Sequence, residues 1–297
     1  MSNIIAIIWD FDKTLINGYM EDPLLKDYGV DSRKFWEEVN ELPKKYMTEQ
    51  GVRVNADTVY LNHFLRYTRD GIFKGLNNAK LREYGDKLEF YPGVPEIFSV
   101  TKSLIEDNAI YREYDIKVEH YIISSGLTEI IRGSKVEPYV NGIWGCEFIE
   151  VDGVIGEIGY TIDNTTKTRA LFEINKGPDV NVNIKLPEEL RRVHFINMVY
   201  VADGPSDIPA FSVINKKGGA TFAVYPAGNM QAMQQVEQMR KDGRINMFAE
   251  ADFSDGKTAS MWLCNKISEF AEKIRENEKN RLRQYTSIKP PQHLINE

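Results

Sequence analysis

The sequence is poor in cysteine and histidine, and it has no long apolar run. Its two cysteines, Cys146 and Cys264, provide neither a disulfide framework nor a cysteine-based metal site, which suits a reducing cytoplasm. The four histidines have no spacing typical of a metal-ligand set. No apolar stretch approaches the roughly 18 residues of a membrane helix. The apolar run near the N-terminus follows no basic residue and ends on two aspartates, so we expect neither a secretory signal nor a membrane span.

Excess positive charge is also absent. Lys and Arg total 37 residues against 44 Asp and Glu, which gives a formal net charge of −7. This balance argues against nucleic acid or an anionic membrane as the main partner. With 297 residues, of which 42% are hydrophobic, the chain can form one large globular domain or two. The sequence gives no indication of the oligomeric state.

The most informative stretch covers residues 4–15. Ile4–Trp9 is an unbroken apolar run rich in β-branched residues, which is typical of a buried strand at the centre of a parallel sheet. Asp10, Asp12 and Thr14 follow at alternate positions, so an extended chain would point all three the same way. We expect them at the carboxyl end of the strand, where open α/β sheets bind ligands. Two carboxylates this close repel each other unless a cation or a phosphate-handling role compensates.

The remaining chain divides into a helical part and an α/β part. Between residues 17 and 89 we expect no strand, and helices near residues 32–39, 57–67 and 78–88. Beyond residue 90, strands are expected at 120–123, 195–202 and 220–225, with short strands or hairpins within 143–162. Further helices are expected at 94–106, 127–132, 168–176, 229–242 and 257–276. Residues 177–192 are expected to form a long loop or insertion, and the tail from about residue 276 is expected to fray.

Three of the expected strands stop on a polar residue: Asp10, Ser124 and Asp203. The alternation of strands and helices predicts an α/β fold with a doubly wound parallel sheet. In such a sheet the carboxyl ends of the strands share one edge. Residues far apart in the sequence would therefore meet in a single site.

Four short motifs in order carry a resemblance to a known family. They are Asp10-Phe-Asp12-Lys-Thr14, Ile122-Ile-Ser-Ser-Gly126, Thr166-Lys167-Thr168 and Asp203-Gly-Pro-Ser-Asp207. The chain resembles the haloacid dehalogenase superfamily of phosphatases and phosphotransferases, and within it the subgroup of phosphoserine phosphatase, which has a helical cap of the C1 type. The match covers residues 1–16 and 90–226. It implies a Rossmann-like core domain of residues 1–16 and 90–297, with a helical cap domain of residues 17–89 inserted after the first strand.

The resemblance also implies roles for individual residues. Asp10 would be the nucleophile that forms an aspartyl-phosphate, and Asp12 the general acid and base. A Mg²⁺ cofactor would be bound by the carboxylates of Asp10, Asp203 and Asp207 and by the backbone carbonyl of Asp12, with Asp207 acting directly or through water. The phosphoryl group would be held by residues of three motifs, namely Thr14, Ser124, Ser125 and Lys167.

The first motif leaves a question of register. The string Asp12-Lys-Thr14 also resembles cation-pumping ATPases, in which the aspartate of that string would be the nucleophile. Asp10 is favoured because the expected strand ends at Trp9 and because Leu15 follows where the pumps have glycine. The dehalogenases of the superfamily lack an aspartate at the position of Asp12, so its presence favours phosphate-ester chemistry.

We therefore interpret the chain as a cytoplasmic, Mg²⁺-dependent phosphatase that hydrolyses a small phosphorylated metabolite. A phosphotransferase of the same superfamily and a non-catalytic protein that binds a phosphometabolite are the alternatives. The resemblance suggests Glu21 as a substrate residue, since related enzymes place a carboxylate here for a substrate amine. Aromatic residues of the cap are expected to form its core rather than a substrate box; they are Phe35, Trp36, Tyr60, Phe64 and Tyr67. The sequence does not identify the substrate.

Overall fold

The computed structural model describes residues 2–178 and 180–286, and its sheet has seven strands in the order β4-β3-β2-β1-β5-β6-β7. The strands are β1 (Ile4–Trp9), β2 (Lys117–Leu127), β3 (Gly142–Val151), β4 (Val154–Tyr160), β5 (Met198–Ala202), β6 (Ala220–Tyr225) and β7 (Met247–Glu250). All neighbouring strands are parallel except β3 and β4, which form an antiparallel hairpin. This arrangement confirms the predicted α/β fold.

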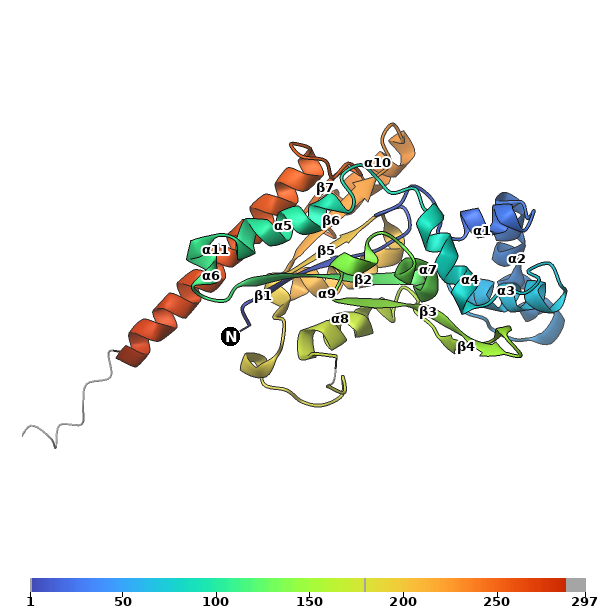
Figure 1. Ribbon diagram of the computed structural model, residues 1–297, viewed down its shortest axis with the longest axis horizontal. Coiled ribbons are helices and arrows are strands. Elements are labelled where there is room, and N and C mark those ends of the chain that lie inside the picture. The colour runs from blue at the N-terminus through green and yellow to red at the C-terminus, as the bar shows by residue number, and fades with distance from the viewer. Residues whose placement is uncertain (1, 179, 287–297) are drawn as a thin grey trace, which may run out of the picture.

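Helices cover the sheet on both sides (Figure 1). On one side α5 (Glu96–Glu106) packs against α11 (Thr258–Thr286), and on the other α8 (Lys167–Lys176) packs against α9 (Ile208–Lys216). The remaining helices of this part are α6 (Ala109–Arg112), α7 (Thr128–Arg132) and α10 (Met230–Lys241). Within the described ranges, no helix is both long enough and apolar enough to cross a membrane.

The first strand lies at the centre of the sheet, as its apolar sequence predicts. Its five residues from Ile5 to Trp9 are fully buried, since strands on both sides and helices above and below exclude water from them. The register pairs Trp9 with Ile122 of β2 and with Val201 of β5. The polar residues that follow these three positions are therefore brought to one edge of the sheet.

The boundaries of several elements differ from expectation. The run 195–202 is split into a short 3-10 helix (Phe195–Asn197) and the strand β5, and β2 does not end before Ser124 but continues through a bulge to Leu127. Helix α11 extends to Thr286, beyond the expected start of fraying, and residues 287–297 lie outside the described part. The strand β7 and the helix α9 were not foreseen.

A mainly helical segment lies between β1 and α5. It contains α1 (Asp22–Asp27), α2 (Ser32–Gln50), α3 (Val59–Arg69), α4 (Asn78–Glu83) and a 3-10 helix (Tyr84–Lys87). The chain leaves and returns side by side, because Ile16 forms a bridge with Phe90 and the N–H of Tyr91 donates to the carbonyl of Leu15 at 2.9 Å. Helix α3 packs against β4. The division into a core domain and a cap domain at these residues stays a prediction.

Candidate active site

Asp10 lies directly after β1, where a tight turn begins. Its N–H continues the sheet by donating to the carbonyl of Val201 at 2.8 Å. The chain then curls instead of staying extended, because Lys13 has a φ of 56° and the N–H of Leu15 donates to the carbonyl of Phe11. The expectation of an extended run was therefore wrong. The curl places Thr14 beside Asp10, and its hydroxyl donates to Asp10 Oδ2 at 3.1 Å.

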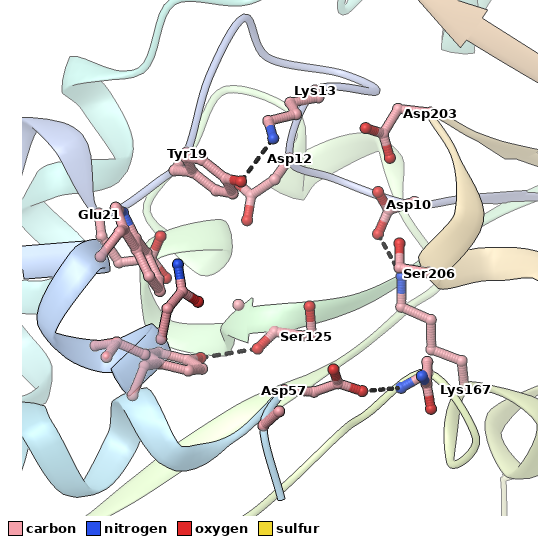
Figure 2. A pocket seen from close by; sticks show the side chains of 17 residues that line it. Asp10, Asp12, Lys13, Tyr19, Glu21, Asp57, Ser125, Lys167, Asp203 and Ser206 are labelled. Atoms are coloured by element: carbon pink, nitrogen blue, oxygen red, sulfur yellow. Dashed lines mark hydrogen bonds and ion pairs between the residues drawn. The ribbon is translucent and has the colours of Figure 1, made fainter. Parts of the chain in front are cut away.

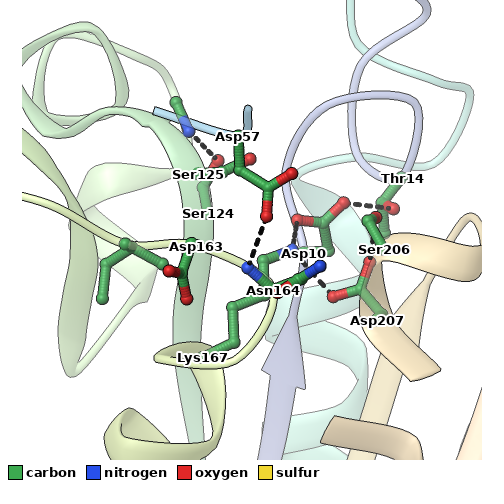
Figure 3. A network of polar contacts seen from close by, with 12 residues as sticks. Asp10, Thr14, Asp57, Ser124, Ser125, Asp163, Asn164, Lys167, Ser206 and Asp207 are labelled. Carbon is green, nitrogen blue, oxygen red and sulfur yellow. Dashed lines mark hydrogen bonds and ion pairs between the residues drawn. The ribbon is translucent and has the colours of Figure 1, made fainter. Parts of the chain in front are cut away.

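Lys167 connects the first and last motifs. Its ammonium group donates to Asp10 Oδ1 and to Asp207 Oδ1, each at 2.7 Å, and its side chain is only 2% exposed (Figure 3). Asp207 also accepts hydrogen bonds from Tyr200 at 2.6 Å and from Ser206 at 3.0 Å. The sequence did not predict this role for Tyr200, because a tyrosine in a buried strand is usually only part of the core.

The lysine is held by the turn that precedes α8. Asp163 Oδ1 accepts hydrogen bonds from the backbone N–H of Thr165 at 2.9 Å and of Thr166 at 2.6 Å, and the Asp163 carbonyl accepts from Lys167 N–H at 3.0 Å. These bonds fix the first turn of the helix and hence the starting point of the lysine side chain. The same turn meets the helical segment, since Asn55 donates to Asp163 Oδ2 at 2.7 Å. Asn164 N–H also donates to Asp57 at 3.2 Å (Figure 3).

Carboxylates crowd this edge of the sheet. Ligand atoms from Asp10, Asp203 and Asp207 lie within 4.8 Å of one another. Burial raises the pKa of Asp10 to about 6, although Lys167 opposes the shift, and burial together with Asp10 raises the pKa of Asp203 to about 7. Burial disfavours the charged ammonium of Lys167, but Asp10 and Asp207 outweigh that effect and raise its pKa. Three oxygen donors that repel one another in this way fit a hard divalent cation such as Mg²⁺.

Asp12 faces a different environment from Asp10. Its Oδ1 accepts a hydrogen bond from the N–H of Met20 at 2.9 Å. Burial, followed by the nearby charges of Glu21 and Asp10, raises its pKa well above the ordinary value. Gly126 permits this packing, because a Cβ there would lie 2.3 Å from Met20 Cε and 3.3 Å from Asp12 Oδ2. The structure therefore holds two neighbouring aspartates in distinct settings, one beside a lysine and one beside another carboxylate.

Two residues that were expected to contact phosphate lie beneath the site rather than at its surface. Thr14 is fully buried against Asp10, and Ser124 is 1% exposed with its Oγ accepting the N–H of Gly126 at 3.0 Å. Neither lines the cavity described below, because the turn after β1 and the bulge in β2 direct them inward. Ser125 does line it.

A cavity of about 370 Å³ lies above these groups, between the sheet edge and the helical segment. Figure 2 shows Asp10 and Asp203 on one side of it and Glu21 on the other. The predicted site residues that line it are Asp10, Asp12, Glu21, Ser125, Lys167 and Asp203. Gly126 of the second motif lines it too. The lining residues to which the sequence gave no site role are Lys13, Tyr19, Trp36, Val39, Asn40, Ala56, Asp57, Tyr60, Asn164 and Ser206.

The aromatic residues of the helical segment divide into two groups. Phe35 and Phe64 are fully buried and pack edge to face with centroids 5.4 Å apart, so the expectation of a core role is correct for them. Tyr60 is also buried in the core and Trp36 packs against it, but both residues line the cavity as well, so a core role does not exclude contact with a ligand for these two. The two groups differ because one face of each helix packs in the core of the helical segment, with Phe35 on α2 and Phe64 on α3. Trp36 on α2 and Tyr60 on α3 lie at the side of that face, next to the cavity.

The sequence is similar to that of a known protein but matches no protein-family model. An uncharacterized protein of Borreliella burgdorferi is 36% identical over 283 residues, which cover 89% of this chain and 97% of that protein.

Solved structures with similar folds include two described as phosphoserine phosphatases. A phosphoserine phosphatase in its apo form has a TM-score of 0.52 and 15% identity, and the match covers 84% of this chain and 95% of that chain. A probable phosphoserine phosphatase from Vibrio cholerae has a TM-score of 0.53 and 16% identity, covering 91% of this chain and 67% of that chain. A HAD family hydrolase from Salmonella enterica serovar Typhi has a TM-score of 0.50 and 18% identity, covering 84% and 67%. The chain therefore belongs to the same family as the Borreliella burgdorferi protein, and its fold is that of the haloacid dehalogenase (HAD) hydrolases.

Proposed function

We propose that this protein is a Mg²⁺-dependent phosphatase that hydrolyses a small phosphomonoester through an aspartyl-phosphate. One observation carries the proposal. Asp10 ends the central strand with one carboxylate oxygen bound by Lys167, within a cluster that also contains Asp203 and Asp207, while Asp12 faces the same cavity with a raised pKa. A nucleophilic carboxylate, a cation for the phosphoryl group and a separate proton donor are the parts that phosphate-ester hydrolysis through an acyl phosphate requires.

The first step joins Asp10 to phosphorus. A carboxylate oxygen of Asp10 attacks the phosphorus atom, and the bond from phosphorus to the ester oxygen breaks. Asp12 donates its proton to that oxygen, so the leaving group departs as a neutral alcohol. The raised pKa of Asp12 supports this role, because a carboxyl group must hold a proton near neutral pH to act as an acid.

The second step releases phosphate. Asp12, now ionised, accepts a proton from water, and the resulting hydroxide attacks phosphorus and frees Asp10. Lys167 neutralises negative charge that develops on the phosphoryl oxygens in both steps. Ser125 at the cavity wall would donate a hydrogen bond to those oxygens, whereas Thr14 would orient Asp10 from below, where its hydroxyl donates to Asp10 Oδ2.

The cation would be held by Asp10 and Asp203, with the backbone carbonyl of Asp12 as a further ligand. Both oxygens of Asp207 already accept hydrogen bonds, which favours a role in orienting Lys167 and in binding the cation through water. When bound, Mg²⁺ supplies positive charge that lets the carboxylates share the pocket and stabilises the transferring phosphoryl group. The cavity volume of about 370 Å³ is near the lower end for ligand pockets, which supports a small substrate.

The test is hydrolysis of an aryl phosphate by the full chain with and without Mg²⁺. We expect turnover that requires Mg²⁺ and that disappears in Asp10→Asn, whose amide cannot attack phosphorus. Circular dichroism of the variant would show that it is folded. A folded wild-type protein that binds phosphate esters without hydrolysing any of them would instead support the non-catalytic alternative.

A further inference from the structure

A second cavity lies within the helical segment. Its volume is about 360 Å³, and among the described residues it shares none of its lining with the cavity at Asp10. Its walls are formed by α2 and α3, which pack against each other, with Gly156 of β4 at one side. The helix residues that line it lie three or four positions apart, so each helix contributes one face. They include Leu42, Tyr46 and Gln50 of α2 and Asn62, Arg66 and Arg69 of α3.

The charge of this cavity is opposite to that of the protein as a whole. The chain has a net charge of −7, yet Arg66 and Arg69 line the cavity and none of the described residues around it is Asp or Glu. In the described part of the chain no carboxylate forms an ion pair with Arg69, and Glu38 lies 3.9 Å from Arg66. Two like charges one helical turn apart are unfavourable, and an anion bound between them would remove that cost.

Arg66 is already oriented for such a ligand. Its guanidinium group donates a hydrogen bond to Nδ1 of His63 at 2.6 Å, and the His63 ring is buried beside the rings of Phe35 and Tyr67. Burial, followed by the charge of Arg66, lowers the pKa of His63, so the ring is neutral near neutral pH and can accept this bond. The other N–H groups of the planar guanidinium can bind a carboxylate or a phosphate. A donor that is fixed in advance loses less entropy when the ligand binds.

The rest of the lining suits the body of a small organic molecule. Leu42, Val52, Val54 and Leu65 contribute apolar side chains, and Tyr46 contributes an aromatic ring. Ligand sites are typically apolar with a few placed polar or charged groups, and a volume of about 360 Å³ lies in the lower part of their range. The ligand that fits is therefore small, with one anionic group next to an apolar body.

One wall of this cavity is the loop of residues 51–58, which connects α2 to α3. Two loop residues, Val52 and Val54, line the second cavity. The loop residues that follow, Ala56 and Asp57, line the catalytic cavity instead. A ligand in the one cavity and a substrate in the other would therefore contact the same short loop.

This loop is docked against the turn that carries Lys167. Asn55 donates to the carboxylate of Asp163, and Asp57 accepts from the N–H of Asn164 (Figure 3). Segments with exposed polar contacts and few buried side chains belong to the part of a protein that opens most easily. A ligand that binds the docked form of the loop better than the open form shifts the population toward the docked form.

We infer that the helical segment contains a regulatory site for a small organic anion, a carboxylate or a phosphate with an apolar body, bound by Arg66 and Arg69. The bound anion keeps the loop 51–58 docked beside Lys167 and thereby favours substrate binding. Because coupling between two sites is reciprocal, substrate and anion each increase the affinity for the other. The regulatory part of this inference rests on the proposed function, whereas the binding of the anion can be measured without it.

Calorimetry with the full chain, in the absence of Mg²⁺, tests the site directly. The probes are phenylacetate, benzylphosphonate and phenylacetamide, which is the neutral analogue of phenylacetate. We expect the two anions to bind about tenfold more tightly than the amide, or more, because hydrogen bonds between two charged groups are stronger than those to a neutral group. If neither anion binds more tightly than the amide, the site does not exist.

Substitutions locate the bound anion. Arg69→Met should weaken phenylacetate binding about tenfold or more. Arg33→Met is the matched control, because Arg33 is an exposed arginine of α2 that pairs with Glu37 and does not line the cavity. Asn62→Glu places a carboxylate in the lining at an exposed helix position and should also weaken binding, whereas the neutral Asn62→Gln should not. Equal binding of phenylacetate to the wild type and to both Arg69→Met and Asn62→Glu would show that it binds elsewhere and would overturn the inference.

Kinetics with an aryl phosphate and Mg²⁺ test the regulation. Phenylacetate should lower the KM of the wild type about fivefold or more, in line with typical coupling between sites, and should leave the KM of Arg69→Met unchanged. A KM that phenylacetate raises equally in both proteins would indicate competition at the catalytic cavity. Either that result or an unchanged KM in the wild type would overturn the regulatory role.

The two proposals fail in different ways. If the wild type hydrolyses aryl phosphate with Mg²⁺ but neither anion binds more tightly than phenylacetamide, the phosphatase function stands and the anion site is refuted. If the wild type hydrolyses no ester, yet binds phenylacetate more tightly than Arg69→Met does, the anion site stands and the catalytic proposal is refuted.

Discussion

Replacing Lys167 by methionine removes the cation that holds the two carboxylates together. The side chain is 2% exposed, and both of its hydrogen bonds, to Asp10 and Asp207, are 2.7 Å long. Removing one partner of a buried ion pair costs about 3–5 kcal/mol, because the remaining charge stays buried without compensation. Loss of one preorganised donor at a reacting group lowers kcat about 10²- to 10³-fold. We therefore expect Lys167→Met to be both less stable and nearly inactive.

The loss of stability should depend on pH in a defined direction. In the wild type, burial raises the pKa of Asp10 to about 6 even though Lys167 lowers it, so removing the lysine raises that pKa further. A carboxyl group whose folded pKa exceeds its unfolded value binds more protons in the folded state, and its contribution to stability falls as pH rises through that window. The deficit of Lys167→Met relative to the wild type should therefore be smaller at pH 5 than at pH 8.

Urea denaturation without divalent cations at the two pH values measures this deficit, and rapid-quench kinetics with Mg²⁺ measures the rate. Lys176→Met is the matched control, because Lys176 lies at the other end of the same helix and, among the described residues, donates hydrogen bonds to the backbone carbonyls of Val182 and Ile184 rather than to a carboxylate. Its kcat should equal that of the wild type. A deficit that is the same at both pH values, or a normal rate in Lys167→Met, would refute the reasoning.

Three further results follow from the structure. Asp10→Asn should form no phosphoenzyme, whereas Asp12→Ala should accumulate it from an aryl phosphate, because this variant retains the nucleophile but has lost the base that activates water. Rapid quench followed by mapping of the labelled peptide measures this. Label on Asp12 in the Asp10→Asn protein would instead identify Asp12 as the nucleophile. Exhaustive chelation should abolish activity and Mg²⁺ should restore it, while Ca²⁺ should inhibit, since its longer bonds and higher coordination number misplace Asp10; full activity in the chelated protein would contradict the metal assignment. Burial lowers the pKa of His120 to about 3, below its unfolded value of about 6.5, so the unfolded state binds more protons in this window and stability should rise with pH across it. Urea denaturation between pH 4.5 and 6.5 should therefore give a slope up to about 1.4 kcal/mol per pH unit steeper for the wild type than for His120→Gln, and equal slopes would contradict the assignment.

The sequence by itself determined the centre of the fold. An unbroken apolar run that ends on two aspartates identifies β1 as a strand buried on both faces, because no exposed strand would carry six such residues. The alternation of strands and helices predicted the parallel sheet, and strands that stop on Asp10 and Asp203 predicted that these two residues meet at one edge, whereas Lys167 was assigned only through the resemblance to the haloacid dehalogenase superfamily. The buried strand is a local feature and the alternation of strands and helices repeats along the chain, so residue pattern and spacing reveal both.

The tertiary structure decided whether Thr14 and Ser124 reach the surface of the cavity. The left-handed conformation of Lys13 turns Thr14 inward, and the bulge in β2 removes Ser124 from the cavity surface. The position of Thr14 depends on a single backbone angle, and that of Ser124 depends on the register of two strands. Residue type alone determines neither the angle nor the register.

The same limit applied to the aromatic side chains of the helical segment. Trp36 and Phe35 are adjacent in the sequence and both aromatic, yet only Trp36 faces the cavity while Phe35 is buried in the core of the helical segment. Which of two neighbouring aromatic side chains meets a ligand depends on the rotation of α2 relative to α3 and β4. That rotation is set by packing between residues far apart in the chain, which local sequence pattern does not reveal.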